Sequence, residues 1–79
     1  MQKWEYLFVK CAHEDNDWHP HSTNGVLLAE GEKWAEMTVH DFSNEVGRQG
    51  WELVSLMTGH SHQGSTEVYR LVFKRPLLA

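Results

Sequence analysis

Six histidines in a chain of 79 residues are the feature of this sequence that could do chemistry. Four of them form two pairs with one residue between the partners: His19 with His21, and His60 with His62. Residues two apart on an extended segment point the same way, so each pair could offer two imidazoles to one metal ion. If both pairs lie at the same end of a sheet, their four nitrogens could bind zinc or a similar divalent ion.

The alternative for these histidines is a surface role without a ligand. Both pairs lie among small polar residues, where histidine is readily tolerated, and no motif such as H-E-x-x-H fixes a ligand spacing. We therefore expect no bound cofactor, with a divalent metal such as zinc on the four histidines as the competing hypothesis. A third hypothesis is an acid-sensing switch, because six histidines would add positive charge below about pH 6.5.

Two other arrangements of reactive side chains have simpler structural explanations. Cys11 lies two residues before His13, but it ends an apolar strand, with no environment that would stabilise a thiolate. We expect it to be a small buried side chain. Glu5 and Glu52 could form a carboxylate pair if their strands are neighbours, although solvation on a strand face explains both. We assign no catalytic residue.

Hydrophobic spacing predicts five strands that would have to position these residues. The predicted strands are residues 3–11, 26–29, 33–37, 51–58 and 67–75. Gly31 suits a tight hairpin between the second and third strands, for which an irregular helix is the alternative. Apolar residues on both faces of the first strand indicate that neither face is fully open to water.

One amphipathic helix is predicted over residues 39–49. Thr38 is placed to accept hydrogen bonds from the free amides of the first turn. Phe42 and Val46 are spaced to share one face of the helix, and Gly50 is placed to end it in the left-handed conformation.

Residues 12–24 are predicted to form an exposed loop. They are rich in polar residues, include Pro20, which lacks a backbone donor, and end at the turn-forming pair Asn24-Gly25. Thirteen residues is long for a loop in a compact domain, so we expect it to be functional or mobile. Trp18, its one large apolar residue, and Trp34 are the candidate binding residues.

Three short motifs occur in order and span nearly the whole chain. They are Trp-Glu-Tyr at 4–6, Gly-Trp-Glu-Leu-Val-Ser at 50–55 and Phe-Lys-Arg-Pro at 73–76. Together they resemble the small bacterial family known as domain of unknown function 4177. The resemblance implies a compact α+β fold with an antiparallel sheet, and it implies no activity. The histidine-bearing segments around residues 19 and 60 are not part of the shared pattern.

These observations predict a single α+β domain over residues 1–79. Its antiparallel sheet of four to five strands packs on one helix, in the order β-β-β-α-β-β. Large aromatic and aliphatic side chains dominate small cores. The expected structural residues are Trp4, Tyr6, Phe42, Val46, Gly50, Trp51, Leu53 and Phe73.

Composition excludes several classes of partner. A net charge of −4, with seven Lys and Arg among eleven Asp and Glu, argues against nucleic-acid binding. No apolar run approaches the roughly 20 residues of a membrane span. The pattern of the first residues predicts a strand and lacks the apolar region of a signal peptide. We therefore expect a cytoplasmic protein with a reduced thiol.

The expected function follows from the small hydrophobic core that so short a chain can form. A domain of this size rarely gains more than roughly 3–5 kcal/mol from its core alone, and its single cysteine cannot form a disulfide within one chain. One helix covers only one face of a sheet. We therefore expect a non-catalytic binding or oligomerisation module that forms a dimer or higher oligomer through its sheet. The alternative is a small metal-binding or metal-dependent enzyme that uses the loop histidines.

Overall fold

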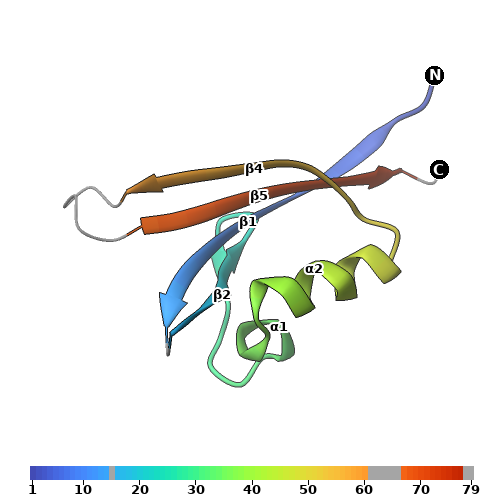
Figure 1. Ribbon diagram of the computed structural model, residues 1–79. Helices are drawn as coiled ribbons and strands as arrows, with labels where there is room; N and C mark the ends of the chain where they lie inside the picture. Colours follow the sequence, from blue (N-terminus) through green and yellow to red (C-terminus); the bar gives the residue numbers. More distant parts are fainter. Residues whose placement is uncertain (15, 61–66, 78–79) are drawn as a thin grey trace.

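The computed structural model describes residues 1–14, 16–60 and 67–77, and these form a sheet with two helices on one side (Figure 1). The elements in chain order are β1 (Trp4–Glu14), β2 (Asp17–Thr23), β3 (Val26–Leu27), α1 (Lys33–Glu36), α2 (Val39–Arg48), β4 (Glu52–His60) and β5 (Glu67–Pro76). The strands lie in the order β3-β2-β1-β5-β4, and all neighbours are antiparallel. The predicted α+β fold is confirmed.

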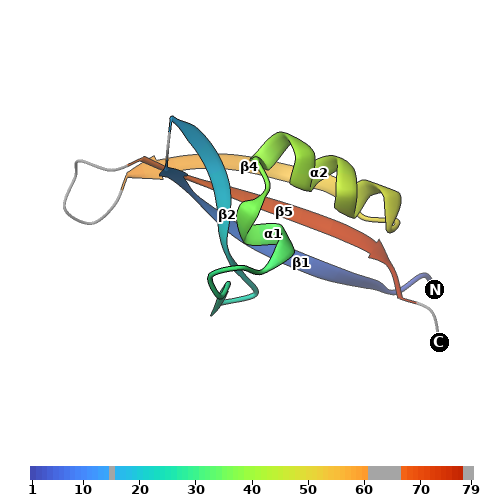
Figure 2. The same ribbon diagram turned by 90° about the horizontal axis from the view of Figure 1, so that it is seen from below.

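The core lies between α2 and the face of the sheet that the helix covers (Figure 2). Phe42 and Val46 are fully buried on the helix, and the Phe42 ring meets the Phe73 ring edge to face, with centroids 6.0 Å apart. The strands contribute alternate residues, because successive strand side chains point to opposite faces. These buried strand residues are Leu7, Val9 and Cys11 of β1, and Leu71 and Phe73 of β5.

The main helix begins and ends where the sequence predicts. The Thr38 hydroxyl accepts a hydrogen bond of 3.1 Å from the Asp41 amide, which satisfies one free donor of the first turn. Gly50 has φ +93°, a left-handed conformation that only glycine adopts readily. The helix expected over residues 39–49 is therefore confirmed to within one residue.

Residues 12–14 and 16–24 form a hairpin arm, so the predicted loop is wrong. β1 continues to Glu14, Asn16 turns the chain with φ +66°, and β2 returns beside β1. Pro20 is tolerated within β2 because β3 pairs with Ser22 and Thr23, and no described strand pairs with Pro20 on that side. The turn predicted at Asn24-Gly25 is confirmed, with positive φ at both residues.

The hairpin predicted over residues 26–37 is also largely wrong. β3 has only two residues, and Lys33–Glu36 form the one-turn helix α1, so the helical alternative is correct for the second segment. The Trp34 ring packs against the Phe42 ring with centroids 5.2 Å apart, and this contact holds the turn of helix on the core. Tertiary packing has overridden the local preference.

Candidate functional site

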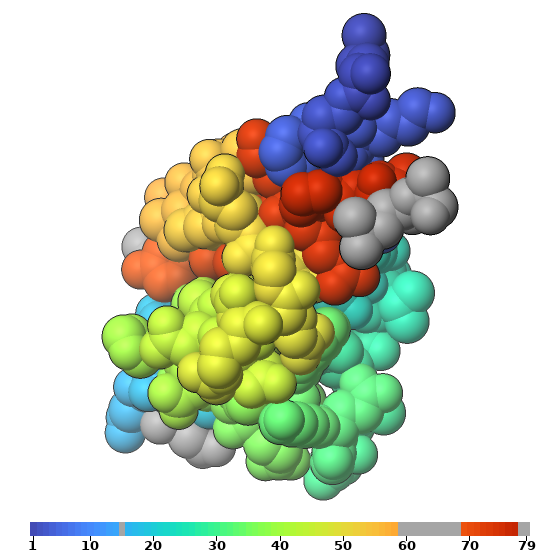
Figure 3. All heavy atoms as spheres, turned by 90° about the vertical axis from the view of Figure 1, so that its right-hand side faces the viewer, coloured from blue at the N-terminus to red at the C-terminus, as the bar shows by residue number. Residues whose placement is uncertain are grey.

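The side of the sheet opposite α2 carries exposed aromatic side chains. Trp4, Tyr6 and Phe8 point away from the core and are 41%, 48% and 55% exposed. Figure 3 shows the helices in green and yellow below the orange β4 and the red β5, and Figure 1 shows no described helix or strand as a layer above these strands. We call this surface the open face and define it by Trp4, Tyr6 and Phe8 of β1, Met57 of β4 and Val72 of β5.

Strand register makes the open face continuous across three strands. Tyr6 lies opposite Lys74 and Phe8 lies opposite Val72, and directly opposed residues share a face. Ser55 lies opposite Val72 from the other side, and the bulge between Leu53 and Ser55 is the one irregularity in this pairing. The Tyr6 and Phe8 rings are neighbours, with centroids 6.3 Å apart.

Charged side chains border the open face at both ends. At one end the Lys74 Nζ lies 4.2 Å from the centre of the Trp4 ring and 4.0 Å from the Glu52 Oε1. At the other end Lys10 and Arg70 lie opposite each other on β1 and β5, and both are exposed. The face is therefore apolar in the middle, balanced in charge at one end and cationic at the other.

The three sequence motifs meet at a corner on the helix side of the sheet. The Arg75 guanidinium pairs with the Glu5 carboxylate, stacks 4.2 Å from the centre of the Trp51 ring and donates to the Gln49 carbonyl oxygen at 3.4 Å. Arg75, near the end of β5, thus joins the start of β1 to the end of α2. This arrangement explains the motifs structurally.

The hypothetical carboxylate pair does not form. Glu5 lies opposite Arg75, and Glu52 lies opposite Lys74. Because Lys74 and Arg75 are adjacent in one strand, they point to opposite faces of the sheet. The two carboxylates are therefore separated by the sheet.

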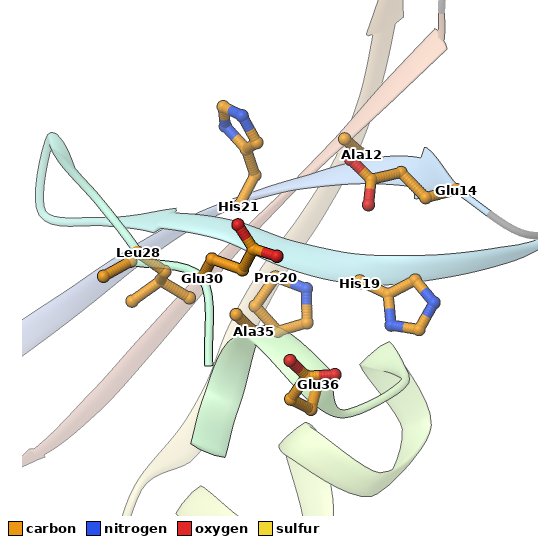
Figure 4. A pocket seen from close by; sticks show the side chains of 10 residues that line it. Ala12, Glu14, His19, Pro20, His21, Leu28, Glu30, Ala35 and Glu36 are labelled. Atoms are coloured by element: carbon orange, nitrogen blue, oxygen red, sulfur yellow. The ribbon is translucent and has the colours of Figure 1, made fainter. Parts of the chain in front are cut away.

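The first histidine pair borders a cavity of about 380 Å³ between β2 and the segment that leads into α1. Figure 4 shows the His19 and His21 rings on opposite sides of β2, so the expectation that they point the same way is wrong. The reason is an extra residue in β2: Pro20 lies opposite Cys11 and Ser22 opposite Lys10, with His21 between them. The His19 Nδ1 lies 2.8 Å from the Met37 carbonyl oxygen.

The second histidine pair cannot be placed beside the first. His60 ends β4, but its side chain and the whole of His62 lie outside the described residues. Among the residues that the structure describes, no three His, Cys, Asp or Glu side chains are grouped to hold a metal ion. A metal on His19, His21, His60 and His62 stays a prediction.

The two candidate binding tryptophans border the core. The Trp18 ring lies 4.0 Å from the Tyr69 ring and 5.2 Å from the His13 ring, measured between centroids. Trp34 packs on Phe42. Both tryptophans are half-buried, and their predicted binding role stays a prediction.

The residues expected to be structural divide into two groups. Phe42, Val46 and Phe73 are buried, Trp51 is half-buried under Arg75, and Gly50 ends the helix. The other three residues are exposed instead: Trp4, Tyr6 and Leu53, the last by 47%. The exposure of Trp4 and Tyr6 could be predicted from the sequence, because these residues alternate along β1 with Leu7 and Val9, which are buried.

Comparison with known proteins adds a family. Residues 4–76 match the model of the family described as domain of unknown function (DUF4177), so the chain belongs to that family. No curated protein and no solved structure matches the chain. Neither described helix is long and apolar enough to cross a membrane.

Proposed function

We propose that this member of the DUF4177 family is a non-catalytic module that self-associates by burying its open face against the open face of a second copy. The observation that carries the proposal is the row of Trp4, Tyr6 and Phe8, three large aromatic side chains about half exposed on a face that α2 does not reach. Contiguous apolar surface of this kind marks interaction sites. A surface that meets its own copy forms a closed two-fold dimer.

The charges around the open face favour one orientation of the two copies. In one arrangement the two-fold axis lies between the two open faces and runs perpendicular to the strands. The strands of the two copies then run in opposite directions, so the Lys10–Arg70 end of one copy approaches the Glu52 end of the other. An axis along the strands would instead place Lys10 and Arg70 against their own copies. Like-charge contacts disfavour the second arrangement.

An interface of ordinary size would take a small share of the surface of the chain. A specific interface of ordinary size buries about 800 Å² on each partner. The chain exposes 5704 Å² in total, so such an interface would take about one-seventh of its surface. The open face, which spans β1, β5 and β4, would have to supply that share.

A double variant tests the proposal. Tyr6→Ser with Phe8→Ser removes two rings from the centre of the open face without emptying the core, because both side chains are about half exposed. We expect light scattering to give a molar mass at most half that of the unmodified protein, with an unchanged circular dichroism spectrum.

The matched control removes apolar surface elsewhere. Val26 and Leu27 of β3 are 67% and 68% exposed, and β2 separates β3 from β1 and its aromatic row. Val26→Ser with Leu27→Ser should keep the mass of the unmodified protein. An unchanged mass for the Tyr6 and Phe8 variant would refute association through the open face.

A further inference from the structure

The last strand of the sheet, β4, offers a second surface of a different kind. β4 is paired with β5 along its length, and its other edge meets no described strand. The opposite edge of the sheet is formed by β3, which has only two residues. Natural proteins keep edge strands short or protect them, because unpaired backbone groups bind other strands. The nine-residue β4 is long for an edge.

Apart from one bulge, β4 also lacks the usual features that protect an edge. Residues 53–59 contain no charged residue and no proline. Leu53, Val54, Leu56 and Met57 are 47%, 50%, 56% and 49% exposed. The bulge lies near the start of the strand, and from Ser55 onward the pairing with β5 is regular. The edge is therefore apolar and uncharged over most of its length, and its one bulge lies near its start.

We propose that β4 pairs antiparallel with β4 of a second copy, around a two-fold axis perpendicular to the sheet at Leu56. The two five-stranded sheets then continue as one sheet of ten strands. This edge contact is separate from the face contact proposed above, because it leaves both open faces on the same side. Face and edge contacts together give an assembly of four copies, and either contact alone gives two.

The charge pattern of β4 favours a second copy as its partner. Antiparallel self-pairing places a strand against its own reversed sequence, so any charge near the centre would oppose a like charge nearby. The uncharged stretch 53–59 avoids this conflict. If the whole stretch of one copy pairs with the whole stretch of the other, its midpoint, Leu56, lies on the axis. A second copy thus supplies a neutral strand of matching length.

The register also satisfies the facing rule of antiparallel sheets. Leu56 lies opposite its own copy, and Ser55 lies opposite Met57 of the other copy. Ser55 and Met57 both belong to the open side, since they oppose Val72 and Arg70 of β5. Leu56 opposes the buried Leu71 and lies on the helix side. Pairing would therefore cover the exposed Leu56 between the two helical layers.

A charge placed at the axis tests the edge contact. Leu56→Lys sets two ammonium groups against each other only if β4 pairs with itself, and the exposed position should tolerate lysine in the folded chain. We expect light scattering to show half the mass of the unmodified protein. Leu27→Lys, at the 68% exposed Leu27 of the other edge, should keep the full mass.

A cross-link tests the register independently of any loss of folding. Opposed residues in an antiparallel pair bring their Cα atoms within the range that a disulfide spans, so Leu56→Cys should give a covalent dimer on mild oxidation. Leu27→Cys should stay monomeric on a denaturing gel. A full mass for Leu56→Lys or the absence of the Leu56→Cys cross-link would overturn the edge contact. Loss of mass only in the Tyr6 and Phe8 variant would leave the face contact as the sole interface.

Discussion

Cys11 shows how strand alternation decides the chemistry of a single residue. It follows Leu7 and Val9 on the covered side of β1 and is fully buried against α2. Burial in this apolar layer raises the pKa of the Cys11 thiol to about 12. His13, two residues further along β1, is exposed and packs against Trp18. The expectation of a small buried side chain is confirmed.

The Cys11 thiol should therefore be unreactive until the chain unfolds. We expect no reaction with a thiol reagent at pH 8 under native conditions and one equivalent of reaction in urea. Because the pKa is about 12 in the folded chain and 9.0 for a free thiol, the unfolded state loses its proton first as the pH rises. Stability should fall above about pH 9, and less so in Cys11→Ala. Rapid native labelling would contradict the burial.

At single residues, sequence predicted what depends on local geometry and missed what depends on neighbours. The left-handed Gly50 and the buried Cys11 could be predicted because a helix stop and strand alternation are local. The opposite directions of His19 and His21 could not, because they depend on a bulge against β1. The Arg75 corner likewise joins residues that are 70 positions apart in sequence.

At the scale of elements, α2 is held in place by its own cap and by ion pairs. The Thr38 hydroxyl caps its first turn, and Glu45 connects it to α1 through an ion pair of 3.4 Å with Lys33. Arg48 and Lys33, together with Gln49, hydrogen-bond the Glu45 side chain and hold the pKa of its carboxyl below the usual value. The helix is thus fixed at its start and along its exposed side.

Loss of the Thr38 cap should destabilise the whole chain, because α2 supplies one entire layer of the core. We expect Thr38→Ala to lower the free energy of unfolding by about 1 kcal/mol. Thr38→Ser keeps the hydroxyl and should stay close to the unmodified protein. Urea denaturation measures both variants, and equal stability for Thr38→Ala and Thr38→Ser would show that the hydroxyl does not stabilise the helix.

The elements that sequence missed are those without strong periodicity. β2 combines polar residues with a proline, which together are typical of a loop, and only its position beside β1 makes it a strand. α1 is a single turn that depends on the contact of Trp34 with Phe42. Both lie in the hairpin arm and the segment after it, where tertiary contacts decide the conformation.

At the scale of the whole molecule, a single helical layer on a five-stranded sheet leaves one face and one long edge without a described neighbour. Sequence predicted apolar residues on both faces of β1, because the alternation of Trp4, Tyr6 and Phe8 with Leu7 and Val9 is plain. It could not predict which side α2 would cover or that β4 would be the edge, since both depend on strand order. The proposed assembly follows from that order.

The central claim is that the open face is buried against a second copy of the chain. Sedimentation equilibrium of the unmodified protein at micromolar concentration tests it most directly. The proposed association predicts a molar mass at least twice the 9.2 kDa of one chain. A mass of 9.2 kDa throughout the concentration range would show that Trp4, Tyr6 and Phe8 stay in water, and association through the sheet would then be refuted.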